Sequence, residues 1–234
     1  VALAGGQDNY WGARMDRVVR TFIRGMAKSG KTCTLLDLAA LCTAEENRER
    51  FTEWMDSERL QFIKRTAERI EGFDDADLEP LAGRLDQWIQ NDAIRDLIAA
   101  RESTVSIRDV VREGKVVVVR NAPSSGETEK RLFATALIRR AWVAVRENTD
   151  APPFYVICDE FDSIVSERTD IASILSEARA FEFCLTLSCQ NPSNQLPERV
   201  QKAIENQCET FISFNPGGRD DARLIAGQHS RDVE

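Results

Sequence analysis

The spacing of apolar positions divides the chain into two parts. Up to about residue 104, apolar residues recur three or four positions apart, which predicts amphipathic helices. The first such stretch carries Met15, Val18, Val19, Phe22, Ile23 and Met26 on one face. From Val105 onward, short apolar runs alternate with helical stretches, and this alternation predicts parallel strands joined by helices. We therefore predict an all-helical domain over residues 1–104 and an α/β domain over residues 105–234.

The α/β part carries recognisable helix boundaries. Ser106 can cap a short helix that Gly114 ends, and Pro197 can open a later one. The predicted strands are the four largely apolar runs at residues 115–120, 154–160, 183–190 and 209–214. Because these runs are apolar at most positions, we expect strands that are covered on both faces.

Two adjacent carboxylates end the second of these runs, Phe154-Tyr-Val-Ile-Cys-Asp-Glu160. A strand that delivers Asp-Glu to its carboxyl end is typical of nucleotide-hydrolysing sites. There, Asp159 would hold Mg²⁺ through water and Glu160 would polarise the attacking water. A strand that simply ends in a solvated acidic turn is the alternative.

The next strand, Phe183-Cys-Leu-Thr-Leu-Ser-Cys-Gln190, also ends in a polar residue. Since parallel strands bind ligands at their carboxyl ends, Gln190 should share a rim with Glu160 and could sense a γ-phosphate. Between the two strands, Arg179 ends a helical stretch. It could satisfy the helix dipole or reach into a neighbouring subunit's site.

Residues 25–32, Gly-Met-Ala-Lys-Ser-Gly-Lys-Thr, fit the phosphate-loop pattern G-x-x-x-x-G-K-[ST]. A phosphate loop follows a buried strand and opens a helix. The preceding residues have helical spacing instead, so we interpret this stretch as a connection between two helices. The alternative is a self-contained P-loop enzyme that binds phosphate with Gly30, Lys31 and Thr32.

These stretches together resemble the HerA/FtsK-type motor ATPases, and most closely the TraG-like coupling proteins of conjugation and type IV secretion. The resemblance rests on Asp159-Glu160, Leu175-Ser-Glu-Ala-Arg179, Leu187-Ser-Cys-Gln190 and Gln195-Leu196. Three further stretches agree with it: residues 11–16, residues 106–119, and residues 210–214 with 220–222. In that family the segment similar to residues 11–23 lies well after the phosphate loop, inside an all-helical insertion.

The resemblance implies a RecA-like P-loop NTPase core with a parallel sheet, plus the all-helical insertion. It implies ATP and Mg²⁺ as cofactors, Asp159 as the Walker B metal residue, and Glu160, Gln190 and Arg179 as catalytic residues. Arg179 would act as an arginine finger in a homo-oligomeric ring, a hexamer by resemblance, that moves DNA. The resemblance also allows secretion-system or relaxase proteins as partners. A non-hydrolytic module that binds a secretion substrate is a further alternative.

Composition narrows these possibilities only slightly. A net charge of −8 argues against a uniformly basic nucleic-acid surface, although a ring needs positive charge only where it contacts phosphate. Six cysteines without a CxxC pair indicate reduced thiols, and a single histidine excludes a His-based metal cluster or triad.

No apolar run is long enough to span a membrane. We expect a cytoplasmic chain, and the resemblance allows an upstream anchor at the inner face of the membrane. Because the chain begins at Val1 and shows no phosphate loop after a strand, we expect a fragment whose phosphate loop lies upstream.

Overall fold

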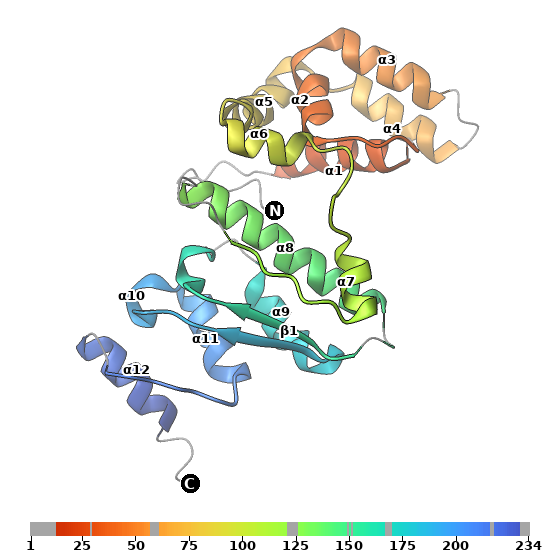
Figure 1. The fold of residues 1–234 in the computed structure, drawn as a ribbon. Helices are drawn as coiled ribbons and strands as arrows, with labels where there is room; N and C mark the ends of the chain where they lie inside the picture. The colour runs from red at the N-terminus through yellow and green to blue at the C-terminus, as the bar shows by residue number, and fades with distance from the viewer. Residues whose placement is uncertain are drawn as a thin grey trace. The chain divides into compact units, whose positions relative to one another are not determined.

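The computed structural model describes residues 13–28, 30–56, 61–120, 126–148, 150, 152–166, 170–215 and 218–229. These residues form two compact units, which divide between Thr104 and Val105 (Figure 1). The first unit is helical in its described residues. The second contains helices and two parallel strands, so the chain as a whole has a mixed α/β structure.

The helical unit consists, in its described part, of α1 Ala13–Lys28, α2 Leu35–Thr43, α3 Glu45–Asp56, α4 Gln61–Glu71, α5 Asp75–Ile89 and α6 Asp92–Ala99. The predicted amphipathic first helix is confirmed. Val18 and Phe22 are fully buried, whereas Ile23 is nearly half exposed. The ring of Phe22 packs 5.9 Å from that of Phe73, next to the start of α5.

Side-chain caps set the starts of α2 and α5. The Thr34 hydroxyl accepts a hydrogen bond from the backbone N–H of Asp37, and the Asp37 carboxylate accepts one from the N–H of Thr34. Asp74 and Asp77 form the same reciprocal pair at the start of α5. This arrangement satisfies amide groups that would otherwise have no partner inside the helix.

Cys42 lies buried in α2, and burial raises the pKa of its thiol from 9.0 to about 12. Because only the thiolate reacts with iodoacetamide, we expect native Cys42 to be alkylated at pH 8.5 at least ~100-fold more slowly than in the denatured chain. The rate should keep rising with pH well above 9. Peptide mapping after timed labelling measures both rates, and equal rates in the two states would contradict the expectation.

The α/β unit is built from α7 Ile107–Glu113, α8 Glu127–Glu147, β1 Phe154–Cys158, η2 Phe161–Ser163, α9 Ile171–Ala178, η3 Arg179–Phe181, β2 Phe183–Leu187, α10 Pro192–Gln195, α11 Glu198–Gln207 and α12 Arg219–His229. The predicted boundaries of α7 are confirmed. The Ser106 hydroxyl accepts the N–H of Asp109 at 3.2 Å, and Gly114 ends the helix with a φ of +64°. A residue with a Cβ would be strained in that left-handed conformation.

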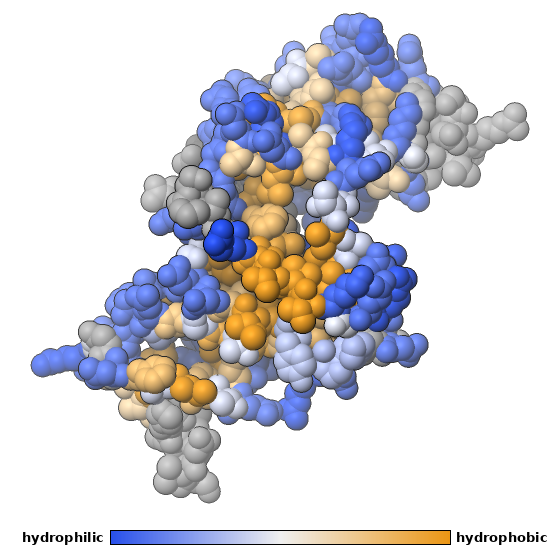
Figure 2. All heavy atoms as spheres, in the orientation of Figure 1, coloured by the Kyte–Doolittle hydropathy of each residue, from blue (hydrophilic) through white to orange (hydrophobic). Residues whose placement is uncertain are grey.

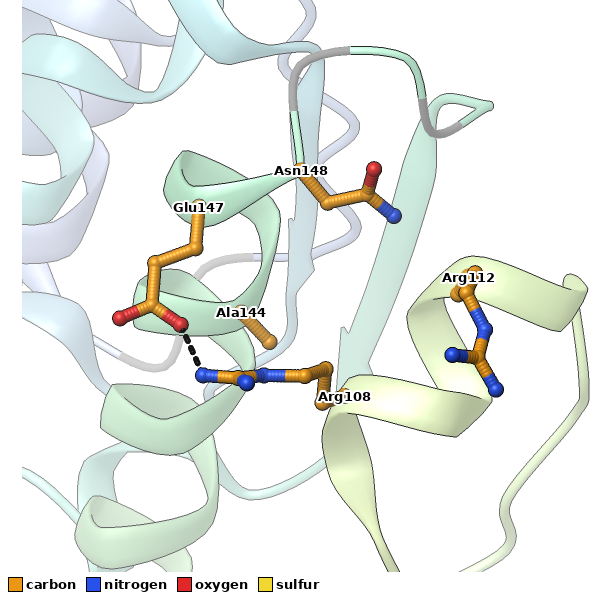
Figure 3. A pocket seen from close by; sticks show the side chains of 5 residues that line it. All are labelled: Arg108, Arg112, Ala144, Glu147 and Asn148. Carbon is orange, nitrogen blue, oxygen red and sulfur yellow. Dashed lines mark hydrogen bonds and ion pairs between the residues drawn. The ribbon is translucent and has the colours of Figure 1, made fainter.

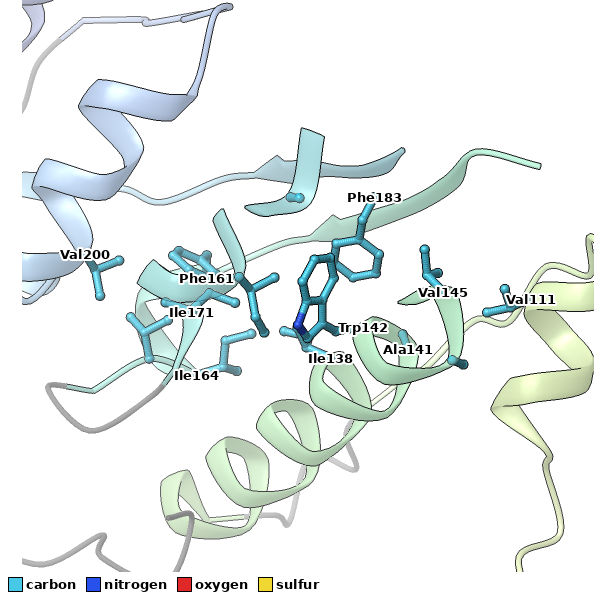
Figure 4. Packing of buried hydrophobic residues seen from close by; sticks show 14 of the residues in the cluster. Val111, Ile138, Ala141, Trp142, Val145, Phe161, Ile164, Ile171, Phe183 and Val200 are labelled. Carbon is cyan, nitrogen blue, oxygen red and sulfur yellow. The ribbon is translucent and has the colours of Figure 1, made fainter. Parts of the chain in front are cut away.

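β1 and β2 pair in parallel, with Phe154 opposite Phe183 and Cys158 opposite Leu187. The connection between them runs through α9, as in a βαβ unit. One face of this sheet packs on the core of the unit. Trp142 of α8 lies 5.4 Å, ring to ring, from both Phe181 and Phe183, at the centre of that core (Figure 4).

The expectation that both faces of the strands are covered is wrong for β1. Its residues alternate between half-buried and exposed, and Tyr155 and Ile157 are 69 % and 79 % exposed. The helices that supply the described core, α7, α8, η2, α9 and α11, all bury residues in the cluster against which Phe154 and Val156 pack. Within the described residues, the side chains on the other face of β1 therefore remain open to solvent.

The predictions of a first and a last strand, at residues 115–120 and 209–214, are also wrong. Residues 115–120 and 209–214 have no regular structure, and Val116 and Val118 are 89 % and 87 % exposed. A strand needs backbone partners as well as apolar side chains, and neither segment pairs with β1 or β2. Figure 2 shows apolar side chains gathered on the face of this unit that carries the segment after α7.

Candidate functional site

The carboxyl ends of β1 and β2 are tied together beyond the strands themselves. The N–H of Ser188 donates to the carbonyl of Cys158 at 2.9 Å, and the N–H of Phe161 donates to the carbonyl of Ser188 at 2.8 Å. The pairing thus continues for one more residue and holds the turn that carries Asp159 and Glu160 next to Ser188. The two strands therefore end at a common rim, as predicted from their sequences.

Asp159 is exposed at this rim, and its carboxylate has a fixed orientation. Its Oδ1 atom accepts a hydrogen bond from the Ser188 hydroxyl at 2.5 Å and another from the N–H of Glu160 at 3.1 Å. The two donors found among the described residues therefore both bond to Oδ1. Oδ2 is therefore the carboxylate oxygen available to solvent or to a hydrated cation.

Glu160 follows in a left-handed backbone conformation, with φ 50° and ψ 48°. For a residue with a Cβ this conformation costs about 1 kcal/mol. The Ser163 hydroxyl, which donates to the Glu160 carbonyl at 2.8 Å, helps to hold the turn. Glu182 has a similar conformation just before β2, so the backbone angle alone does not mark a site. What distinguishes Glu160 is its exposed carboxylate beside Asp159.

Gln190 is exposed at the same end of the sheet, just beyond the last paired residue of β2. The structure therefore brings Asp159, Glu160 and Gln190 to one rim. Ser188 belongs there as well, although we did not single it out from the sequence. Only the register of the sheet identifies it, since a parallel ladder with Cys158 opposite Leu187 places Ser188 opposite Asp159.

Cys189, which precedes Gln190 in the chain, carries a half-buried thiol that we did not predict to be functional. Burial, and then the carboxylates of Asp162 and Asp221, raise the pKa of the Cys189 thiol. Asp221 is 3 % exposed and accepts the N–H of Ser193 at 3.0 Å, which joins α12 to α10. This hydrogen bond holds α12 against the start of α10, which follows the segment that carries Gln190.

Arg179 does not join the rim. It begins η3, which precedes β2, so it lies at the amino end of the strands, whereas Ser188 lies at the other end of β2, a strand about 16 Å long. Its side chain is 91 % exposed and donates to the Glu209 carboxylate at 2.8 Å. Within one chain, Arg179 is thus turned to solvent and away from Asp159 and Glu160.

The stretch that matches the phosphate-loop pattern lies in the helical unit. Gly25 to Lys28 are the last residues of α1, and Ser29 lies outside the described residues. Gly30 has a φ of +67°, and α2 begins only at Leu35. The carbonyl of Thr32 accepts a hydrogen bond from Arg101 at 2.7 Å. The helix expected before this stretch is therefore confirmed, but residues 25–28 belong to that helix, and the described part of the connection to α2 begins at Gly30.

A shallow pocket of about 230 Å³ lies between α7 and the C-terminal end of α8 (Figure 3). Arg108 donates to Glu147 at its centre, and Arg112 pairs with Asp109 at 2.7 Å. Because carboxylates of the same unit already neutralise both guanidinium groups, the pocket offers little excess charge to an anionic ligand. None of the residues that we predicted to be functional line it.

No group of three or more His, Cys, Asp or Glu side chains in the described part of the chain has the arrangement of a metal site. No described helix is both long enough and apolar enough to cross a membrane. No protein-family model matches this chain, and neither does any curated protein or any solved structure.

Proposed function

We propose that the rim formed by Asp159, Glu160, Ser188 and Gln190 is the hydrolytic part of an ATPase site in a DNA-translocating motor of the coupling-protein type. The observation that carries this proposal is the pairing of β1 with β2, which joins the Asp-Glu turn to the segment that ends in Gln190. The DNA substrate and the RecA-like core rest on the sequence resemblance alone.

The residues of the rim fit Mg²⁺. It prefers oxygen ligands, keeps several waters, and is commonly held by one or two carboxylates together with substrate phosphates. A single oriented carboxylate such as Asp159 is sufficient for that purpose, and it does not require a cluster of acidic residues. When bound, the ion would neutralise charge on the phosphates of ATP.

The other residues take distinct roles in this proposal. Glu160 would orient the attacking water and accept its proton, and Gln190 would hydrogen-bond the γ-phosphate. Arg179, which lies at the other end of the strands, would act on the site of a neighbouring subunit in a homo-oligomeric ring. The acidic net charge of −8 then requires that any DNA contact be confined to a small part of the surface.

The proposal also needs a phosphate-binding loop, and among the described residues none follows a strand and opens a helix. The test is ATP binding and hydrolysis by the natural-length protein and its Lys31→Ala variant. We expect the variant to remain within about twofold of wild type, because Lys31 follows a helix and no strand leads into it.

Loss of ATP binding in Lys31→Ala would identify residues 25–32 as the phosphate loop and would contradict this expectation. Absence of ATP hydrolysis from the wild-type protein, with and without DNA, would instead favour a non-hydrolytic interaction module.

A further inference from the structure

Ser188 makes three hydrogen bonds to the turn that carries Asp159 and Glu160. Its N–H and its carbonyl bond to Cys158 and Phe161, and its hydroxyl donates to Asp159. The first two bonds use main-chain atoms, which any residue other than proline could supply. Only the third depends on the serine side chain, so the hydroxyl has a role that can be separated from the folding of the sheet.

We propose that Ser188 is a positioning residue that orients the Asp159 carboxylate and thereby sets the divalent-cation affinity of the site. This inference rests on the proposed function, because it assigns a role to Asp159 as the cation-binding residue. Ser188 itself would not bind the cation. It acts through Oδ1 of Asp159, which also accepts the N–H of Glu160.

The reason is geometric. A carboxylate on an exposed turn can rotate, and an unrestrained Asp159 would present either oxygen over a range of directions. Two donors on Oδ1 restrict that rotation and leave Oδ2 as the oxygen that would bind a cation. Mg²⁺ demands nearly ideal octahedral geometry, so its affinity is sensitive to such restriction. Loss of a hydrogen bond that orients a metal ligand typically costs 10- to 100-fold in metal affinity.

The experiment measures Mn²⁺ binding by electron paramagnetic resonance, in the natural-length protein with a non-hydrolysable ATP analogue. Mn²⁺ replaces Mg²⁺ because both prefer oxygen ligands and Mn²⁺ is paramagnetic. We expect Ser188→Ala to bind Mn²⁺ about 10-fold more weakly than wild type. Ser188→Thr should stay within about twofold, because threonine retains the hydroxyl donor.

Ser176→Ala is the matched control. Its hydroxyl donates to the carbonyl of Ser173 in α9 at 2.8 Å, away from the rim, so its removal should leave Mn²⁺ binding unchanged. Thermal unfolding of each variant shows whether a loss of binding follows a loss of folding. A Ser188→Thr variant that binds as weakly as Ser188→Ala at an unchanged melting temperature would overturn the inference.

Asp159→Asn separates this inference from the proposed function. If Asp159→Asn loses Mn²⁺ binding but Ser188→Ala retains it, Ser188 does not position the carboxylate and only the inference fails. If Asp159→Asn binds Mn²⁺ and hydrolyses ATP as wild type does, Asp159 is not the cation-binding residue. The proposed function then fails, together with everything that rests on it.

Discussion

Replacing Glu160 with glutamine is expected to lower ATP turnover by ~10²–10⁴-fold, the usual contribution of a general base. The change keeps the size of the side chain and removes its charge. The hydrogen bonds that the structure gives Glu160 are made by its main chain, to Asp159 and Ser163, so the turn should remain intact. Nucleotide binding should therefore stay within a few-fold of wild type while hydrolysis stops.

Steady-state hydrolysis and equilibrium binding of an ATP analogue, measured on the natural-length protein, check this expectation. Glu177→Gln is the matched control, because Glu177 is an exposed glutamate of α9 that faces Arg146 and not the rim. We expect that variant to turn over at the wild-type rate. A Glu160→Gln protein that hydrolyses ATP within threefold of wild type would show that another group activates the water.

Replacing Arg179 with alanine is expected to lower turnover by ~10³–10⁵-fold in the assembled protein, the range attributed to arginine fingers. The reason is the place of Arg179 at the amino end of the strands, where it cannot reach the Asp159 of its own chain. The Arg179–Glu209 pair is highly exposed, with side chains 91 % and 76 % accessible, so its loss should change stability very little. Nucleotide binding should also persist.

Mixing the two inactive variants tests whether the site is shared between subunits. In a random ring of equal parts Glu160→Gln and Arg179→Ala, roughly a quarter of the sites would combine an intact Glu160 with an intact Arg179 of the neighbour. Activity should therefore reappear on mixing. Arg139→Ala, which removes an exposed arginine paired with Asp170, serves as the control and should remain active. No recovery on mixing would place both residues in one chain's site.

The helix boundaries of this protein could be predicted because they depend on neighbouring residues. Ser106 and Gly114 bracket α7 through a cap and a left-handed turn that involve only a few consecutive positions. The same holds for the Asp74–Asp77 pair. The helical period over α1 was likewise sufficient to predict a helix, and not a strand, before residues 25–32, despite their match to a phosphate-loop pattern.

The strands were less predictable, since strand formation depends on residues that are distant in the sequence. Residues 154–158 and 115–120 are similarly apolar, yet only the first segment pairs in the sheet. No local signal distinguished them, because the decisive factor is whether another strand lies alongside. Which residues of β1 are half-buried and which are exposed also depends on the helices that cover the strand, and this is a property of the packed unit.

For the candidate site, the sequence alone determined which residues could carry the chemistry. An apolar run that ends in Asp159 and Glu160, and another that ends in Gln190, indicate the carboxyl ends of two parallel strands. Only the tertiary structure decided that Ser188 bonds to Asp159 and that Arg179 lies at the opposite end of the sheet. The pairing of β1 with β2 decided both, because hydrogen bonds between strands fix which residues of two distant segments become neighbours.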